Sequence, residues 1–102
     1  MFDLKMNKTI RCKDGFSMSV QAGETQYCYP RENGADRYTE VEIGFPNRCE
    51  ELLLKYAEDS ERPTETVYPY VPAPVVTLVI AKHGGMVEGE LPAGIPCLRA
   101  DR

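Results

Sequence analysis

The N-terminal part of the chain alternates hydrophobic and polar residues in a way that predicts a β-hairpin over residues 7–20. An Asp-Gly dipeptide at positions 14–15, typical of tight hairpin turns, separates two strand-like runs. After the turn, Phe16, Met18 and Val20 alternate with polar residues. Because successive side chains of a strand point to opposite faces, we expect these three side chains to be buried on one face of a sheet.

A second pair of strands is predicted in the next part of the chain. Thr25–Tyr29 is a short strand-like run that ends at Pro30, since proline cannot donate a hydrogen bond to a strand ladder. Residues 31–37 are polar and contain an Asn-Gly turn signal, so they predict a loop. Tyr38–Phe45 has the clearest alternation in the chain and predicts a strand that pairs with Thr25–Tyr29 across this loop.

The middle of the chain predicts a helix with an acidic first turn. Asn47 is a favourable N-cap, and Glu50 lies three residues later, as in a capping box. Glu50 and Glu51 would then lie in the first turn, where the positive end of the helix dipole favours acids. One face of this helix is expected to be hydrophobic, through Cys49, Leu52, Leu53 and Tyr56.

A second, largely buried helix is predicted over residues 75–82. Its valines and isoleucine favour a strand by propensity, but the flanking residues favour a helix. Pro74 precedes the segment, and proline suits the first turn of a helix. Lys82 and His83, followed by two glycines, are typical of a helix C-terminus with a left-handed cap.

Two further strands complete the predicted fold. Thr66–Val71 predicts an edge strand interrupted by Pro69, and Met86–Leu91 predicts a final short strand. The element order is therefore ββββ-α-β-α-β. We expect an α+β fold, in which two helices pack on one face of a small, mostly antiparallel sheet.

The length of 102 residues suits one domain, so residues 1–102 are expected to form a single domain. Residues 1–6 are a candidate N-terminal extension, because Met6 is an alternative start. Residues 92–102 contain two prolines and a glycine and are expected to form a flexible tail. The N-terminus lacks the apolar segment of a secretory signal, which favours a cytoplasmic protein. The longest apolar run is far shorter than the ~20 residues that span a bilayer, so no membrane partner is expected.

The charge of the chain is uneven. The formal net charge is −4, and residues 40–65 hold eight acids against three bases, a net charge of −5 that leaves +1 for the rest. A nucleic-acid-binding protein usually carries a basic stripe, so direct binding to DNA or RNA is disfavoured. An acidic segment could instead face a basic surface of a partner protein. The alternative is that these acids only keep the domain soluble.

Candidate catalytic and metal-binding residues are few. His83 is the only histidine, and its place before two glycines favours a helix C-cap over a general base. Phosphate-loop and dinucleotide-binding motifs are absent, so we predict no catalytic residues, no cofactor and no enzyme. The four cysteines are widely spaced and are expected to be free thiols, so no metal site is assigned. A zinc module that combines isolated cysteines with His83 is the alternative.

Tyrosines are the remaining candidates for a contact surface, because they bury area at low entropic cost. Tyr27 and Tyr29 share one face of a predicted strand, and Tyr68 and Tyr70 share a face of another. The alternative is that they line the core, with their hydroxyl groups at its rim. Combined with the acids, they give a predicted partner-binding set: Glu50, Glu51, Glu58, Asp59, Glu61, Tyr68 and Tyr70.

Four blocks of the sequence resemble a group of small proteins of tailed bacteriophages and prophages. The blocks are FSMSVQAGETQYCYPR, YTEVEIGFP, TVYPYVP and VVTLVIAKHGG, and the resemblance covers most of residues 8–91. It implies a phage protein that acts in the cytoplasm of a bacterial host and brings no catalytic residues with it. Small acidic phage proteins are often inhibitors of host defence, including anti-CRISPR proteins, by analogy of setting.

Three functional hypotheses follow from the sequence. The first is a non-enzymatic phage protein that binds and inhibits a host-defence complex such as a CRISPR effector, by occupying a basic, nucleic-acid-binding surface. The second is a structural or replication accessory protein of a phage. The third is the small metal-binding module. None of them assigns an oligomeric state.

Overall fold

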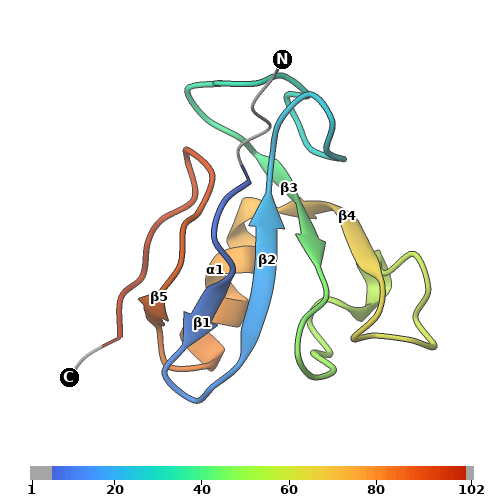
Figure 1. Cartoon of the computed structure of the whole chain (residues 1–102), viewed down its shortest axis with the longest axis vertical. Helices are drawn as coiled ribbons and strands as arrows, with labels where there is room; N and C mark the ends of the chain where they lie inside the picture. Colours follow the sequence, from blue (N-terminus) through green and yellow to red (C-terminus); the bar gives the residue numbers. More distant parts are fainter. Residues whose placement is uncertain (1–5, 101–102) are drawn as a thin grey trace.

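The computed structural model describes residues 6–100, which form a five-stranded antiparallel sheet with one α-helix against it (Figure 1). The strand order across the sheet is β4-β3-β2-β1-β5. The α+β class and the antiparallel sheet are as predicted, but the structure has one α-helix instead of two, and the predicted element order is not matched. The elements are β1 (Ile10–Cys12), β2 (Ser17–Gln21), β3 (Glu40–Gly44), the 3-10 turn η1 (Leu54–Tyr56), β4 (Val67–Pro72), α1 (Ala73–Lys82) and β5 (Met86–Glu88).

The hairpin of β1 and β2 forms as predicted, with Ile10 opposite Met18. Asp14 begins its turn, and its carboxylate accepts a hydrogen bond from the N–H of Phe16 at 2.9 Å. Gly15 adopts a φ of 93°, a conformation that favours glycine. The side chains of Phe16 and Met18 are buried, which confirms the predicted alternation and places this face of β2 toward the core.

The predicted strand Thr25–Tyr29 does not form, and β3 pairs with β2 and β4 instead. Only Tyr29 makes a bridge, opposite Glu40. The N–H of Tyr27 donates to the carboxylate of Glu42 at 2.8 Å rather than to a backbone carbonyl. The Cys28 thiol is buried and donates to the carbonyl of Gly23. Side-chain partners therefore replace a ladder, and the segment between β2 and β3 is a loop.

The predicted helix after Asn47 is also wrong: this segment consists of turns and the 3-10 turn η1. The amide of Asn47 is used elsewhere, because its Oδ1 accepts from the N–H of Ser17 and its Nδ2 donates to the carbonyl of Gly15. Glu50 does not complete a capping box, because its carboxylate contacts Lys82, His83 and the N–H of Leu52 instead. The side chains expected to cap a helix thus make tertiary contacts instead. Because a short helix without caps is only marginally stable, the predicted helix does not form.

The second predicted helix is confirmed as α1. It begins after Pro72 and ends at the C-cap residue His83. The N–H of Gly84 donates to the carbonyl of Ala81, and the N–H of Gly85 donates to that of Ile80, which is the Schellman arrangement. Both glycines have φ near 90°. Capping and the burial of three side chains against the sheet therefore outweigh strand propensity; those side chains are Val76, Val79 and Ile80.

The edge strand β4 is confirmed over nearly the predicted range, while β5 is shorter than predicted and pairs with β1. The part of the predicted tail that the structure describes runs beside β5, where Met86 exchanges backbone hydrogen bonds with Leu98 and Ala100. Of the candidate N-terminal extension, residues 1–5 lie outside the described residues. No helix formed by residues 6–100 is both long and apolar enough to cross a membrane.

Candidate functional site

A network of charged side chains, with a buried centre at His83 and Glu50, lies at the end of α1. The Nδ1 atom of His83 lies 2.6 Å from Oδ2 of Asp14, and its Nε2 atom lies 2.6 Å from Oε1 of Glu50. The ring of Phe16 stacks on the imidazole, with centroids 4.1 Å apart and planes 9° apart. The exposed fractions are 8% for His83 and 1% for Glu50. The network therefore joins the β1–β2 turn, the segment after β3 and the end of α1.

Two further cations balance the carboxylates of this network. The Nζ atom of Lys82 donates to Oε2 of Glu50 at 2.8 Å, and the guanidinium of Arg48 lies 3.5 Å from Oδ1 of Asp14. Since both ring nitrogens of His83 face carboxylate oxygens, both donate when the ring is the imidazolium ion. Each carboxylate then has two cationic partners. Every buried side-chain nitrogen or oxygen of the described residues has a hydrogen-bond partner.

The network changes the acidity of its carboxyl groups. The hydrogen bond from His83 lowers the pKa of Asp14 below its usual value, helped by the N–H of Phe16. Burial alone would raise the pKa of Glu50, but hydrogen bonds from Lys82, the N–H of Leu52 and His83 outweigh it, so this pKa is lowered. The hydrogen bond to Glu50 in turn raises the pKa of Lys82. Both carboxylates are therefore ionised near neutral pH.

The geometry of the network suits a structural clamp better than catalysis. Both ring nitrogens of His83 are engaged by carboxylates of the protein, so neither is free to contact a substrate. Cys12 carries the buried thiol in the same hairpin, and burial together with the charge of Asp14 raises its pKa to about 11. That thiol is therefore protonated and weakly nucleophilic near neutral pH. The main effect of this arrangement is to join three segments of the chain by charge-assisted hydrogen bonds.

The predicted partner-binding set divides into buried and exposed residues. Glu50 is buried in the charge network, and Tyr68 is fully buried at 0% exposure, with its hydroxyl donating to the carbonyl of Pro63 at 2.6 Å. Their burial is at odds with a place on a contact surface, because both side chains already serve internal partners. The other five side chains are exposed: Glu51, Glu58, Asp59, Glu61 and Tyr70.

A β-bulge explains why Tyr68 is buried while Tyr70, on the same strand, is exposed. Val41 lies opposite Val71 and Ile43 opposite Tyr68, so Pro69 and Tyr70 together oppose the single residue Glu42. The extra residue breaks the alternation of faces that a regular strand imposes. Tyr70 adopts a φ of 53°, and its N–H donates to the carbonyl of Tyr27 instead of to β3. Its side chain is consequently 44% exposed.

The bulge brings Tyr70 against the loop between β2 and β3. The rings of Tyr27 and Tyr70 lie 5.9 Å apart at 49°, a tilted pairing of two exposed side chains. The guanidinium of Arg31 lies 5.1 Å from the centroid of Tyr27. Glu42 supports the loop from β3 through its hydrogen bond to the N–H of Tyr27. We call Tyr27, Tyr70, Arg31 and Glu42 the tyrosine cluster.

A second exposed aromatic residue in left-handed backbone, Phe45, lies at the opposite end of the β3–β4 pair. Phe45 has a φ of 47° and is 60% exposed. Its N–H donates to the carbonyl of Thr66, just before β4 begins. Left-handed backbone is uncommon for bulky residues and costs about 1–2 kcal/mol. Such strain persists where the surroundings enforce it and is frequent at functional sites.

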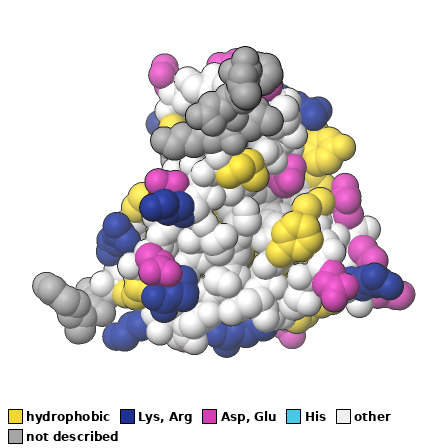
Figure 2. Space-filling view, viewed as in Figure 1, with side chains coloured by type: hydrophobic (Ala, Val, Ile, Leu, Met, Phe, Trp, Pro, Cys, Tyr) yellow, Lys and Arg dark blue, Asp and Glu magenta, His cyan; other side chains and the backbone are white. Residues whose placement is uncertain are grey.

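Three exposed acids of the set, Glu58, Asp59 and Glu61, lie in the loop that precedes β4, and this loop and Phe45 both bond to Thr66. Glu58 and Asp59 are tied to the start of the strand, since the N–H of Glu58 donates to the carbonyl of Val67 and that of Asp59 to Oγ1 of Thr66. We call residues 58–61 the acidic loop. Figure 2 shows acidic side chains gathered at the right edge of the molecule, over the region that carries this loop in Figure 1. Acidic loop and tyrosine cluster thus flank the same edge strand.

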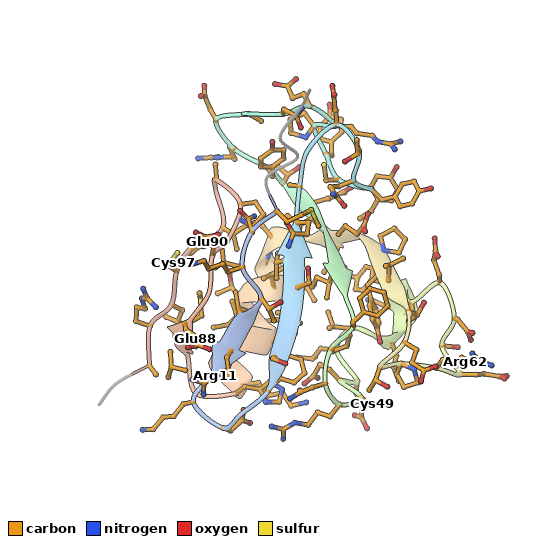
Figure 3. All side chains as sticks on the ribbon, viewed as in Figure 1. Arg11, Cys49, Arg62, Glu88, Glu90 and Cys97 are labelled. Carbon is orange, nitrogen blue, oxygen red and sulfur yellow. The ribbon has the colours of Figure 1, made fainter. Side chains whose placement is uncertain are left out.

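The remaining candidates show less organisation. Cys12 and Cys28 are buried, whereas Cys49 and Cys97 are exposed, and all four are free thiols. Residues 6–100 contain no group of three or more His, Cys, Asp and Glu side chains arranged to hold a metal ion. A shallow depression near Glu88 and Glu90 lies beside β1 and β5 (Figure 3). Its Glu88 already pairs with Arg11 at 3.0 Å.

The sequence patterns did not reveal the role of Asp14 in the charge network or the exposure of Phe45 beside β4. The sequence predicts only a turn residue at Asp14, although a carboxylate at a hairpin tip is free to reach another element. The alternation over Tyr38–Phe45 groups Phe45 with Val41 and Ile43, yet those two side chains are buried and Phe45 is exposed. The Phe-Pro and Pro-Tyr dipeptides were the available signals, since proline disrupts a ladder and often accompanies bulges.

Comparison with known proteins adds no family to this picture. No protein-family model matches the chain, and no curated protein and no solved structure matches it.

Proposed function

We propose that this protein is a non-enzymatic binding protein whose contact surface lies along β4. The surface comprises the tyrosine cluster, Phe45 and the acidic loop. The partner is a protein with a basic surface in the cytoplasm of a bacterium. The phage resemblance of the sequence makes a host-defence complex, such as a CRISPR effector, the specific version of this proposal. In that version, the chain inhibits by covering a surface that otherwise binds nucleic acid.

The observation that carries the proposal is the pair of exposed aromatic residues in left-handed backbone, Phe45 and Tyr70. The backbone of each residue is strained, yet neither ring is buried in the core. Exposed aromatic side chains are the residues that most often dominate the energy of protein interfaces. Folding alone would favour Gly or Asn at both positions, so a role outside the fold accounts for the aromatic residues.

The charge of the same surface supports the choice of partner. Glu58, Asp59 and Glu61 are exposed and lie at the start of β4. An acidic patch accelerates association with a basic surface and disfavours nucleic acid. The engagement of both His83 nitrogens by carboxylates supports a non-enzymatic role, because the only histidine then serves the fold.

Capture of a partner from a lysate of the phage host, followed by its identification, tests this proposal. The bait is the full chain, and two variants are compared with it. Reversing the charge at three positions (E58K, D59K and E61K) removes the acidic loop, and F45N removes one aromatic residue in a conformation that Asn tolerates. We expect both variants to capture at least tenfold less of a partner with a basic surface, with the loss from charge reversal greatest at low salt.

A control is E88K together with E90K, which reverses exposed acids at and just after β5, the edge of the sheet opposite β4. Equal capture by the control, the charge-reversed variant and the unmodified chain would overturn the proposed surface. Incorporation of the chain into virus particles, with no soluble partner, would replace the binding role with the structural alternative.

A further inference from the structure

We propose that Tyr70, Tyr27 and Glu42 recognise an arginine side chain of the partner. This inference rests on the proposed function. It specifies which partner side chain binds near the C-terminal end of β4, away from the acidic loop. The guanidinium would stack on the ring of Tyr70 and pair with the carboxylate of Glu42.

The ring faces of this cluster suit a guanidinium. The face of an aromatic ring attracts cations, and arginine is the side chain most often found there. The chain already shows such a contact, because Arg31 lies 5.1 Å from the centroid of Tyr27. Tyr70 lies next to it, and no Lys or Arg of the described residues stacks over its ring. One ring of the pair is therefore occupied by a guanidinium from the chain itself, and the other is open to one from outside.

Glu42 supplies the charge that such a site needs. It is the single residue opposite the bulge of Pro69 and Tyr70, and its Oε1 accepts the N–H of Tyr27 at 2.8 Å. It makes no ion pair with a Lys or Arg of the described residues, although it is half-buried. The side-chain amide of Gln26 also lies 3.3 Å from both oxygens of Glu42 and donates to them in its favourable orientation. A carboxylate has about four acceptor positions, so Glu42 retains capacity for a further donor.

The combination of ring and carboxylate discriminates between basic side chains. A guanidinium is planar and weakly hydrated, so it can stack on a ring and donate two hydrogen bonds in its plane at the same time. A lysine ammonium is compact and strongly hydrated, and it can satisfy only one of these contacts well. The site should therefore prefer arginine over lysine, whereas an acidic loop alone attracts both.

Titration of the full chain with two short peptides, followed by amide NMR shifts, tests this inference. The peptides are identical except that one carries arginine and the other lysine at each basic position. We expect shifts at Tyr27, Glu42 and Tyr70 with the arginine peptide, and affinity about two- to fivefold weaker with the lysine peptide. Equal affinity for the two peptides, or shifts confined to the acidic loop, would overturn arginine recognition.

Variants sharpen the result. Y70N keeps a residue that tolerates left-handed backbone while removing the ring, and E42Q removes the charge while keeping the shape. Both should abolish the preference for arginine. Y29L and E40Q are matched controls on the same loop and strand and should leave the preference unchanged. Amide shifts away from the cluster report whether each variant keeps the fold.

The outcomes separate the inference from the proposed function. If the arginine preference is present but capture of a lysate partner is unaffected by Y70N and by charge reversal, the proposed function fails and the arginine site stands. If capture depends on Tyr70 while the two peptides bind equally, the contact surface stands and arginine recognition fails.

Discussion

The charge network around His83 and the tyrosine cluster around Tyr70 both combine aromatic and charged side chains, but they differ in burial. In the network, His83 and Glu50 are buried, and both are paired with charged groups from other segments. In the cluster, aromatic rings are exposed, and one of them is held there by strained backbone. The network strengthens the fold where water is excluded, whereas the cluster presents hydrophobic area where a partner could cover it. Burial, more than residue type, therefore decides whether a side chain stabilises the fold or stays accessible at the surface.

The largest expected effect comes from breaking the buried network. Glu50→Ala would leave His83 and Lys82 without their shared carboxylate, and removing one partner of a buried ion pair costs about 3–5 kcal/mol. Urea unfolding measures this loss in the free energy of unfolding. Glu51→Ala is the matched control, because the neighbouring carboxylate is exposed, and we expect a change within about 0.5 kcal/mol. Equal losses in the two variants would mean that the network does not stabilise the fold.

Acid should remove part of the same stabilisation. The folded pKa values of Asp14 and Glu50 lie below their ordinary values of 3.8 and 4.5, so the folded state binds fewer protons than the unfolded state. Their contribution is complete above the ordinary values and is lost as the pH falls through the lowered ones. Urea unfolding at about pH 6.5 and about pH 3 measures the loss. It should be smaller in D14N/E50Q, and an unchanged acid loss would contradict this assignment.

The two tyrosines of β4 offer a smaller and more direct comparison. Tyr68→Phe removes the hydroxyl that donates to the carbonyl of Pro63, and leaving a buried acceptor without its donor costs about 1–2 kcal/mol. Tyr70→Phe removes an exposed hydroxyl and should change the free energy of unfolding by less than about 0.5 kcal/mol. Thermal or urea unfolding of the two variants side by side gives the difference. A similar cost for both would place Tyr70 in the core.

The smallest expected effect has the opposite sign. Tyr70→Asn and Phe45→Asn relieve left-handed strain at exposed positions and should raise the free energy of unfolding by up to about 1 kcal/mol. The same variants should lose partner binding, so stability and contact would change in opposite directions. Equilibrium unfolding checks the first half and capture checks the second. A clear loss of stability in either variant would show that the ring packs usefully onto the fold.

Local sequence signals predicted the elements whose stabilising groups lie nearby in the chain. The β1–β2 hairpin followed from its turn and its alternation, and α1 followed from the proline before it and the glycines after it. The helix predicted after Asn47 failed because its capping groups bind Ser17, Gly15 and the charge network, which are distant in sequence. The strand predicted at Thr25–Tyr29 failed because side-chain partners took the place of a ladder.

The candidate sites were predictable only in part for the same reason. The acidic loop was evident from composition, since an exposed loop needs no specific partner to remain charged. The split between Tyr68 and Tyr70 depends on a bulge, which exists only when β3 lies opposite β4 and one residue too many must be accommodated. A helix C-cap was the correct place for His83, but its two carboxylate partners come from residues more than 30 positions away.

By itself, the sequence determined an α+β domain with a tight first hairpin, a glycine-capped buried helix and an acidic segment before an edge strand. These features follow from turn chemistry, capping and periodicity, which act over a few residues. Only the tertiary structure decided that Glu50 is an internal ion-pair partner and that Tyr70 is a surface residue. Burial and strand register are properties of segments brought together from across the chain, and no local pattern encodes which side chain a distant segment will cover.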